Sequence, residues 1–173
     1  MIRIGTRGSQ LALAQTRSIA EFLTGAGEQV EIVTVRTEGD RRQDVQLAAI
    51  GGKGLFVREI EEMLLSGAID CAVHSLKDLP AQLPSGLVLA AFPEREDARD
   101  VLVTREPARF QSLRPGARVG TGSPRRRALA LSLRPDLVVE PVRGNVDTRL
   151  RKLVSEGWDG VILAVSGTLL PLW

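Results

Sequence analysis

Short apolar runs alternate with helical patterns along most of the chain, and this alternation limits the possible folds more than any other feature. The apolar runs predict strands at residues 2–5, 30–36, 69–73, 87–92, 101–104, 118–120, 137–140 and 160–165. Apolar residues at helical spacing predict helices at residues 9–23, 55–65, 124–134 and 147–156. Strands that are separated by helices predict an α/β fold with mainly parallel sheets.

A charged segment divides this pattern into two series. Residues 94–100 (EREDARD) follow an apolar run, and we interpret them as a hinge between a first α/β lobe at 1–93 and a second at 101–173. The polar, glycine-containing residues 37–52 are predicted to form a loop. We expect the second lobe to be truncated, because only eight residues follow the apolar run at 160–165, where a parallel lobe ordinarily continues with a helix.

Composition excludes several protein classes. The chain has 173 residues, of which 43% are apolar, so it can bury an ordinary core. Its single cysteine excludes an internal disulfide. The N-terminus enters a strand pattern directly, and no apolar run approaches the roughly 18 residues of a membrane span. We therefore expect a soluble, cytoplasmic protein.

The densest group of reactive side chains lies at residues 73–80 (VHSLKDLP), after a predicted strand. In open α/β folds ligands bind beyond the carboxyl ends of the strands. Asp78 is placed there to act as an acid or base or to hold a cation, although an aspartate in such a loop is often a turn residue. His74 is the only histidine, and the sequence has no cluster with zinc-ligand spacing. Cys71, inside the apolar run, is interpreted as a buried, inert thiol.

Three turns from strand to helix carry arginines: residues 6–10 (TRGSQ), 120–127 (GTGSPRRR) and 143–149 (RGNVDTR). Ser123 is a favourable N-cap, and a capped helix start next to arginines favours an anion. A well-capped helix with solvated arginines is the alternative for 120–127, and a surface loop is an equally good interpretation of 143–149. Residues 51–54 (GGKG) lack the spacing of a phosphate-binding P-loop.

Together these residues resemble the hydroxymethylbilane synthase family, also called porphobilinogen deaminases, of tetrapyrrole (heme and porphyrin) biosynthesis. The matching segments occur in family order at residues 6–9, 51–56, 74–80, 94–100, 119–126 and 143–149. The resemblance implies a transferase that takes four porphobilinogens, releases ammonia from each and links them into hydroxymethylbilane. It also implies a covalently attached dipyrromethane cofactor, two lobes like those of periplasmic binding proteins, and a monomer.

The resemblance assigns roles by position. Asp78 matches the catalytic aspartate, which binds pyrrole N–H groups and stabilises the cationic azafulvene formed when ammonia leaves. The arginines that hold carboxylates of substrate and cofactor are Arg7, Arg125, Arg126, Arg143 and Arg149. Further cofactor or substrate contacts are implied for Ser9, Lys53, Ser75, Lys77, Thr121 and Ser123. We expect this sequence to lack the family's third domain, whose cysteine carries the cofactor, because Cys71 does not match that cysteine.

Two other function classes remain open on the residues alone. A non-catalytic two-lobed protein that binds carboxylated small molecules would share the architecture, and ammonia release from porphobilinogen separates it from the transferase. Nucleic-acid binding through residues 118–134 is less well supported, because aromatic residues are few and the net charge is only +2. We therefore expect porphobilinogen and oligopyrroles as partners, and no nucleic acid, membrane or metal.

Overall fold

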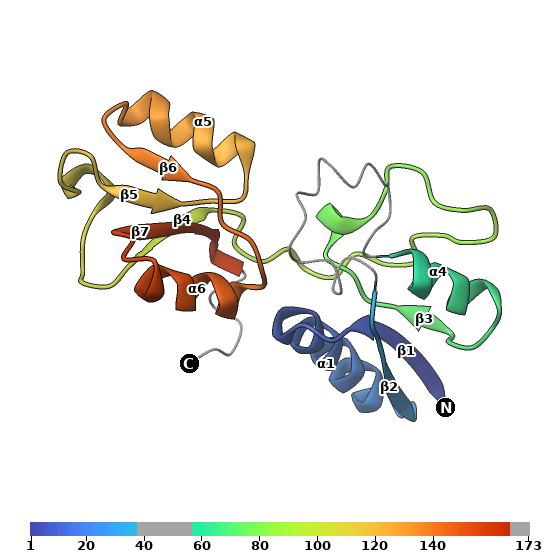
Figure 1. Ribbon diagram of the computed structural model, residues 1–173. Helices are drawn as coiled ribbons and strands as arrows, with labels where there is room; N and C mark the ends of the chain where they lie inside the picture. The colour runs from blue at the N-terminus through green and yellow to red at the C-terminus, as the bar shows by residue number, and fades with distance from the viewer. Residues whose placement is uncertain (38–56, 167–173) are drawn as a thin grey trace. The chain divides into compact units, whose positions relative to one another are not determined.

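The computed structural model describes residues 1–37 and 57–166. Contacts between residues divide the chain into two compact units, Met1–Pro93 and Glu94–Trp173, each built on its own sheet (Figure 1). Most of the predicted loop at 37–52, together with Lys53, lies outside the described residues. No helix within the described ranges is long and apolar enough to cross a membrane.

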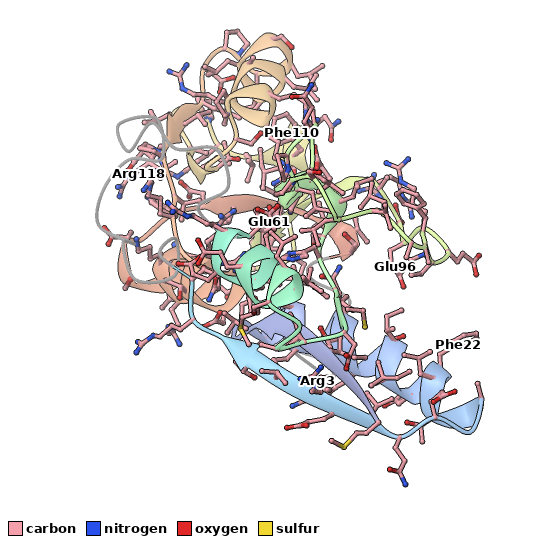
Figure 2. All side chains as sticks on the ribbon, turned by 90° about the vertical axis from the view of Figure 1, so that its right-hand side faces the viewer. Arg3, Phe22, Glu61, Glu96, Phe110 and Arg118 are labelled. Carbon is pink, nitrogen blue, oxygen red and sulfur yellow. The ribbon has the colours of Figure 1, made fainter. Side chains whose placement is uncertain are left out.

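The first unit contains a three-stranded parallel sheet in the order β2-β1-β3. Its elements are β1 (Ile2–Arg7), α1 (Gln10–Gly25), β2 (Val30–Val35), α4 (Arg58–Leu65), β3 (Cys71–Ala72) and the 3-10 turn η1 (Leu76–Asp78). Each described helix forms where the apolar spacing predicts one. Phe22 is an exception to the apolar packing of α1, because its side chain projects from the last turn and is exposed (Figure 2).

The central strand β1 packs on both faces because successive side chains point to opposite sides. Thr6 contacts α1, since its hydroxyl accepts a hydrogen bond of 2.7 Å from Thr16. Gly5 faces the other side of the sheet. A Cβ on Gly5 would meet Ile60 of α4 and Ile69, which precedes β3. The two helices therefore lie on opposite faces of this small sheet, and Ile60 and Ile69 are buried.

The second unit contains a four-stranded sheet in the order β4-β7-β5-β6. Its elements are β4 (Asp100–Thr104), η2 (Phe110–Ser112), β5 (Arg118–Gly120), α5 (Pro124–Leu133), β6 (Val138–Glu140), α6 (Val146–Ser155) and β7 (Gly160–Ala164). Along β7, Val161 and Leu163 belong to a core with Leu153 of α6, whereas Ile162 belongs to a core with Ala130 of α5. Helices α5 and α6 thus cover opposite faces of the sheet (Figure 1).

The sheets are mainly parallel, as predicted, but β4 runs antiparallel to β7. Asp100, the last residue of the expected hinge, pairs with Ala164 as the first residue of β4. The strand predicted at 87–92 is wrong, because this segment has no regular secondary structure. Val88 is 82% exposed and Phe92 65% exposed. An apolar run forms a strand only where a neighbouring strand supplies hydrogen bonds, and within the described residues no strand pairs with this segment.

Candidate functional site

In the first unit, Asp78 lies beside Arg7 at the carboxyl end of the central strand. Asp78 Oδ2 is 3.6 Å from Arg7 Nη1, and both side chains are partly buried. The two residues line a small cavity together with four further polar residues: Ser9, Gln15, His74 and Ser75. The structure therefore brings together Arg7 and Asp78, which are 71 positions apart in the sequence.

Local hydrogen bonds explain how these side chains are held. Ser9 caps α1, since its Oγ accepts the Ala12 N–H at 3.2 Å. Ser75 Oγ donates to Gln15 Oε1 at 2.9 Å, which ties the loop after β3 to α1. These contacts fix the N-terminus of α1 and the η1 turn relative to each other. They therefore also fix the position of Asp78 beside Arg7.

His74 lines the same cavity. Burial lowers the pKa of His74, Asp78 opposes this effect and Arg7 adds to it. The cavity has a volume of about 30 Å³, which is about the space of one water molecule. It is too small to enclose a pyrrole ring.

In the second unit, one carboxylate joins two arginines at the start of α5. Arg126 Nε donates to Asp100 Oδ1 at 2.9 Å, and Arg125 Nη2 donates to Asp100 Oδ2 at 3.1 Å. The Arg126 side chain is only 13% exposed. Arg149 is partly buried, and its pKa is lowered by burial and by the charge of Arg126. We define Arg125, Arg126 and Arg149 as the arginine cluster. Its three positive charges exceed the single negative charge of Asp100.

The turn between β5 and α5 sets the geometry of the arginine cluster. Thr121 is buried, and its Oγ1 accepts the Ser123 N–H at 3.3 Å. Ser123 in turn caps α5 through the Arg126 N–H. A Cβ on Gly122 would lie 2.5 Å from the carbonyl oxygen of Val142, so only glycine allows this close approach.

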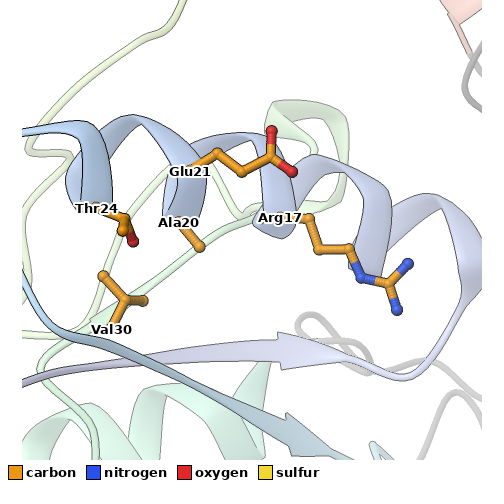
Figure 3. Close-up of a pocket in the computed structure, with 5 residues that line it drawn as sticks. All are labelled: Arg17, Ala20, Glu21, Thr24 and Val30. Carbon is orange, nitrogen blue, oxygen red and sulfur yellow. The ribbon is translucent and has the colours of Figure 1, made fainter.

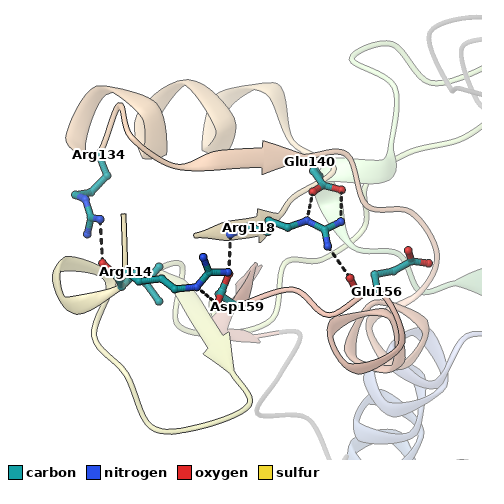
Figure 4. A network of polar contacts seen from close by, with 7 residues as sticks. Arg114, Arg118, Arg134, Glu140, Glu156 and Asp159 are labelled. Atoms are coloured by element: carbon teal, nitrogen blue, oxygen red, sulfur yellow. Dashed lines mark hydrogen bonds and ion pairs between the residues drawn. The ribbon is translucent and has the colours of Figure 1, made fainter. Parts of the chain in front are cut away.

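A separate charged network in the second unit is internally balanced. Arg118 Nε lies 2.6 Å from Glu140 Oε1, and Arg114 Nη2 lies 2.9 Å from Asp159 Oδ2 (Figure 4). Trp158 Nε1 donates to the other Glu140 oxygen at 3.2 Å. The network connects β5, β6 and the start of β7. Because each of these arginines faces a carboxylate, the network offers little net charge to a ligand.

The first unit also has a larger, open hollow between α1 and the start of β2. It measures about 310 Å³ and is lined by Arg17, Ala20, Glu21, Thr24 and Val30 (Figure 3). It contains none of the predicted site residues, and its one arginine is balanced by one glutamate. A ligand with several carboxylates is therefore better matched by the arginine cluster.

Comparison with known proteins agrees with the resemblance. Residues 2–169 match the family model described as porphobilinogen deaminase, dipyromethane cofactor binding domain. The chain is 55% identical to the porphobilinogen deaminase of Syntrophus aciditrophicus (strain SB), over 99% of this chain and 57% of the relative. It is 54% identical to that of Caulobacter sp. (strain K31), over 96% of this chain and 55% of the relative. The chain belongs to the porphobilinogen deaminase family.

The chain thus spans a little over half the length of these family members. The family model names the part that binds the dipyrromethane cofactor. The side chains present fit such a group, because the guanidinium fork binds carboxylates in a planar geometry and the arginine cluster carries excess positive charge. Cys71, the one cysteine, is partly buried in β3, and burial raises the pKa of its thiol.

The family residues predicted from the sequence fall into separate groups. Arg7, Ser9, Ser75 and Asp78 share the cavity of the first unit. In the second unit, Arg125 and Arg126 share a carboxylate, and Thr121 and Ser123 form the turn that precedes them. Arg149 Nε donates to the Gly144 carbonyl at 2.8 Å, next to the partly buried Arg143. Lys77 is exposed, and Lys53 lies outside the described residues.

Sequence reasoning missed three residues of these sites. Gln15 and His74 line the cavity of the first unit, and Asp100 links the arginines of the second. The signal for His74 and Gln15 was present, since one is adjacent to Ser75 and the other lies on the helix that Ser9 caps. Asp100 had no local signal, because its partners are 25 and 26 residues away.

Proposed function

We propose that the protein acts as a hydroxymethylbilane synthase, which removes ammonia from porphobilinogen and joins four of the resulting pyrroles head to tail. The observation that carries this proposal is the placement of Asp78 beside Arg7 in a polar cavity of a chain that matches the porphobilinogen deaminase family over residues 2–169.

Asp78 is proposed as the catalytic residue. When ammonia leaves, the bond between the methylene carbon and nitrogen breaks and nitrogen takes the electron pair, which leaves a positive charge delocalised over the pyrrole. The Asp78 carboxylate accepts the pyrrole N–H and stabilises that charge where it develops. A new carbon–carbon bond then forms to a free ring carbon of the next pyrrole, and that carbon loses its proton.

The arginines are proposed to hold the carboxylates that accumulate as pyrroles are added. Each pyrrole carries an acetate and a propionate, so an elongating chain needs several cationic side chains. Arg125, Arg126, Arg143 and Arg149 would bind these groups in the second unit, and Arg7 in the first. When bound, the dipyrromethane supplies the free ring carbon to which the first substrate is joined. Arg118 is paired with Glu140 and Arg134 with Asp136, and this local neutralisation of charge within residues 118–134 favours the proposal over nucleic-acid binding.

A chimera tests the proposal. This chain replaces the matching part of the Syntrophus aciditrophicus relative, and ammonia release from porphobilinogen is measured with and without Asp78→Asn. The substitution keeps the size of the side chain and removes its charge, so we expect turnover to fall by about a hundredfold or more while substrate binding persists. Asp70→Asn is the matched control, because Asp70 is an exposed carboxylate of the same unit that pairs with Arg3.

Each result has a defined meaning. Near-normal turnover in Asp78→Asn would remove the catalytic role of this carboxylate. Saturable binding of porphobilinogen without ammonia release in the unmodified chimera would favour the alternative, a non-catalytic binding protein for carboxylated small molecules. Loss of turnover in both Asp78→Asn and Asp70→Asn would indicate a general effect of removing negative charge from the first unit.

A further inference from the structure

Asp100 occupies a central position in the second unit that the family resemblance does not assign. It begins β4, and its side chain, 23% exposed, reaches the first turn of α5. One oxygen accepts from Arg126 Nε and the other from Arg125 Nη2. Arg126 Nη2 also lies 2.9 Å from the first oxygen, so Asp100 contacts one edge of that guanidinium.

The contacts of Asp100 leave most of the donor capacity of the two arginines for a ligand. Each guanidinium carries N–H donors along several edges. Asp100 uses one edge of Arg126 and one nitrogen of Arg125. The single negative charge of Asp100 does not neutralise both Arg125 and Arg126. The third cation, Arg149, lies at the same turn, because its Nη2 would be 3.9 Å from a Cβ on Gly122.

We propose that Asp100 is a positioning residue that holds Arg125 and Arg126 in the orientation in which they bind the carboxylates of the substrate or cofactor. This inference rests on the proposed function. Arginine has a long side chain with considerable rotamer freedom, and fixing it before a ligand arrives lowers the entropic cost of binding. The Arg125 side chain is 67% exposed, and Asp100 is its one side-chain partner among the described residues.

Simple electrostatics predicts the opposite effect, and this makes the proposal testable. If Asp100 acted only as a negative charge near an anion site, its removal would strengthen binding of a carboxylate. If Asp100 positions the arginines, its removal weakens binding although the site becomes more positive. The sign of the change in affinity therefore distinguishes the two roles.

The experiment measures the dissociation constant of porphobilinogen for the purified 173-residue chain by calorimetry. For Asp100→Ala we expect an increase in Kd of about fivefold or more, and for Asp100→Asn a smaller increase, because the amide retains one acceptor oxygen. Asp97→Ala is the matched control. It removes the same charge three residues earlier, from a carboxylate that accepts hydrogen bonds from Arg99 instead of Arg125 and Arg126. Unchanged or tighter binding in Asp100→Ala would overturn the proposal.

A second measurement separates positioning from a general loss of structure. In the Arg126→Ala background, Asp100→Ala should weaken binding much less than in the original chain, because its main partner is already absent. Equal weakening in both backgrounds would show that Asp100 acts elsewhere and would overturn the proposal.

A third readout does not depend on the substrate. Solvent exchange of the Arg126 Nε–H, followed by NMR, should accelerate in Asp100→Ala and remain slow in Asp97→Ala. If the unmodified chain does not bind porphobilinogen, the exchange rate still tests whether Asp100 restrains Arg126, and ammonia release by the chimera tests the proposed function separately. An unchanged exchange rate in Asp100→Ala would overturn the positioning role.

Discussion

Trp158 packs against Gly120 so closely that a Cβ on Gly120 would lie 2.6 Å from Cζ3 of the indole ring. Gly120 is the last residue of β5 and immediately precedes Thr121 in the turn that carries the arginine cluster. Trp158 is buried, and its Nε1 is held by Glu140. The ring is thus in close contact with Gly120 and is hydrogen-bonded to Glu140 through its Nε1.

Gly120→Ala is expected to destabilise the second unit by about 1–3 kcal/mol, the usual cost of overpacking a core. Urea unfolding followed by circular dichroism measures the change. Gly25→Ala is the control, because no atom lies within 4 Å of its added Cβ, and alanine near a helix end should stabilise by about 0.5–1 kcal/mol. An equal, small effect of both substitutions would show that Trp158 yields easily.

The paired hydroxyls of Thr6 and Thr16 predict a coupled effect on stability. Thr16 Oγ1 lies 2.7 Å from Thr6 Oγ1 and 2.8 Å from the Ala12 carbonyl, and both threonines are buried. Thr16→Val should cost about 1–3 kcal/mol, because the buried Thr6 hydroxyl then keeps only its longer contact of 3.4 Å to the Ala12 carbonyl oxygen.

A double-mutant cycle tests this coupling. Replacing both Thr6 and Thr16 with valine should cost less than the sum of the single changes, because the hydrogen bond between the two hydroxyls is then lost only once. Thr24→Val, an exposed position of the same helix, should change the free energy of unfolding by less than about 0.5 kcal/mol. Strict additivity of the two buried substitutions would contradict the pairing.

Arg149 should be required for binding of carboxylates. Its Nε donates to the Gly144 carbonyl, which orients the guanidinium, and its Nη2 would lie 3.9 Å from a Cβ on Gly122, in the turn before α5. Arg149→Leu should raise the Kd for porphobilinogen by about tenfold or more, the usual loss for a charge-assisted hydrogen bond. Arg149→Lys should recover only part of this affinity, because lysine lacks the fork.

The control for Arg149 is Arg127→Leu, at an exposed position on α5. It removes the same charge and should leave the Kd within about twofold, since an exposed arginine outside the cluster contributes little. If both substitutions weakened binding equally, overall charge rather than the site would govern affinity.

The ion pair between Arg3 and Asp70 predicts a pH-dependent stability. Hydrogen bonds from the Arg3 side chain and backbone lower the pKa of Asp70 from 3.8 to about 2. The folded state therefore binds this proton less tightly than the unfolded state does. The stabilisation is fully present above pH 3.8 and is lost as the pH falls through about 2.

Thermal unfolding across this pH range measures the effect. Asp70→Asn should lower Tm at neutral pH, and the difference from the unmodified chain should shrink as the pH falls toward 2. Glu21→Gln, at an exposed position, is the control with no comparable contact among the described residues. A difference in Tm that stays constant with pH would show that the charge of Asp70 does not stabilise the fold.

Much of this protein was predictable because its strongest signals are local. Ser123 was identifiable as a helix cap, since a cap acts on the backbone within one turn. The alternation of strands and helices predicted the α/β class, and the ordered motifs identified the family. Each of these signals needs only a few neighbouring residues.

The tertiary structure decided which distant residues meet. The apolar run at 87–92 has the composition of a strand but pairs with no described strand, and β4 runs antiparallel although the pattern predicted parallel strands. Asp100 looked like one charge among many in the segment 94–100, yet sheet register places it against Arg125 and Arg126. A carboxylate has the same local pattern whether it is solvated or bonded to distant arginines, so only the packing of β4 against α5 and β7 could distinguish these states.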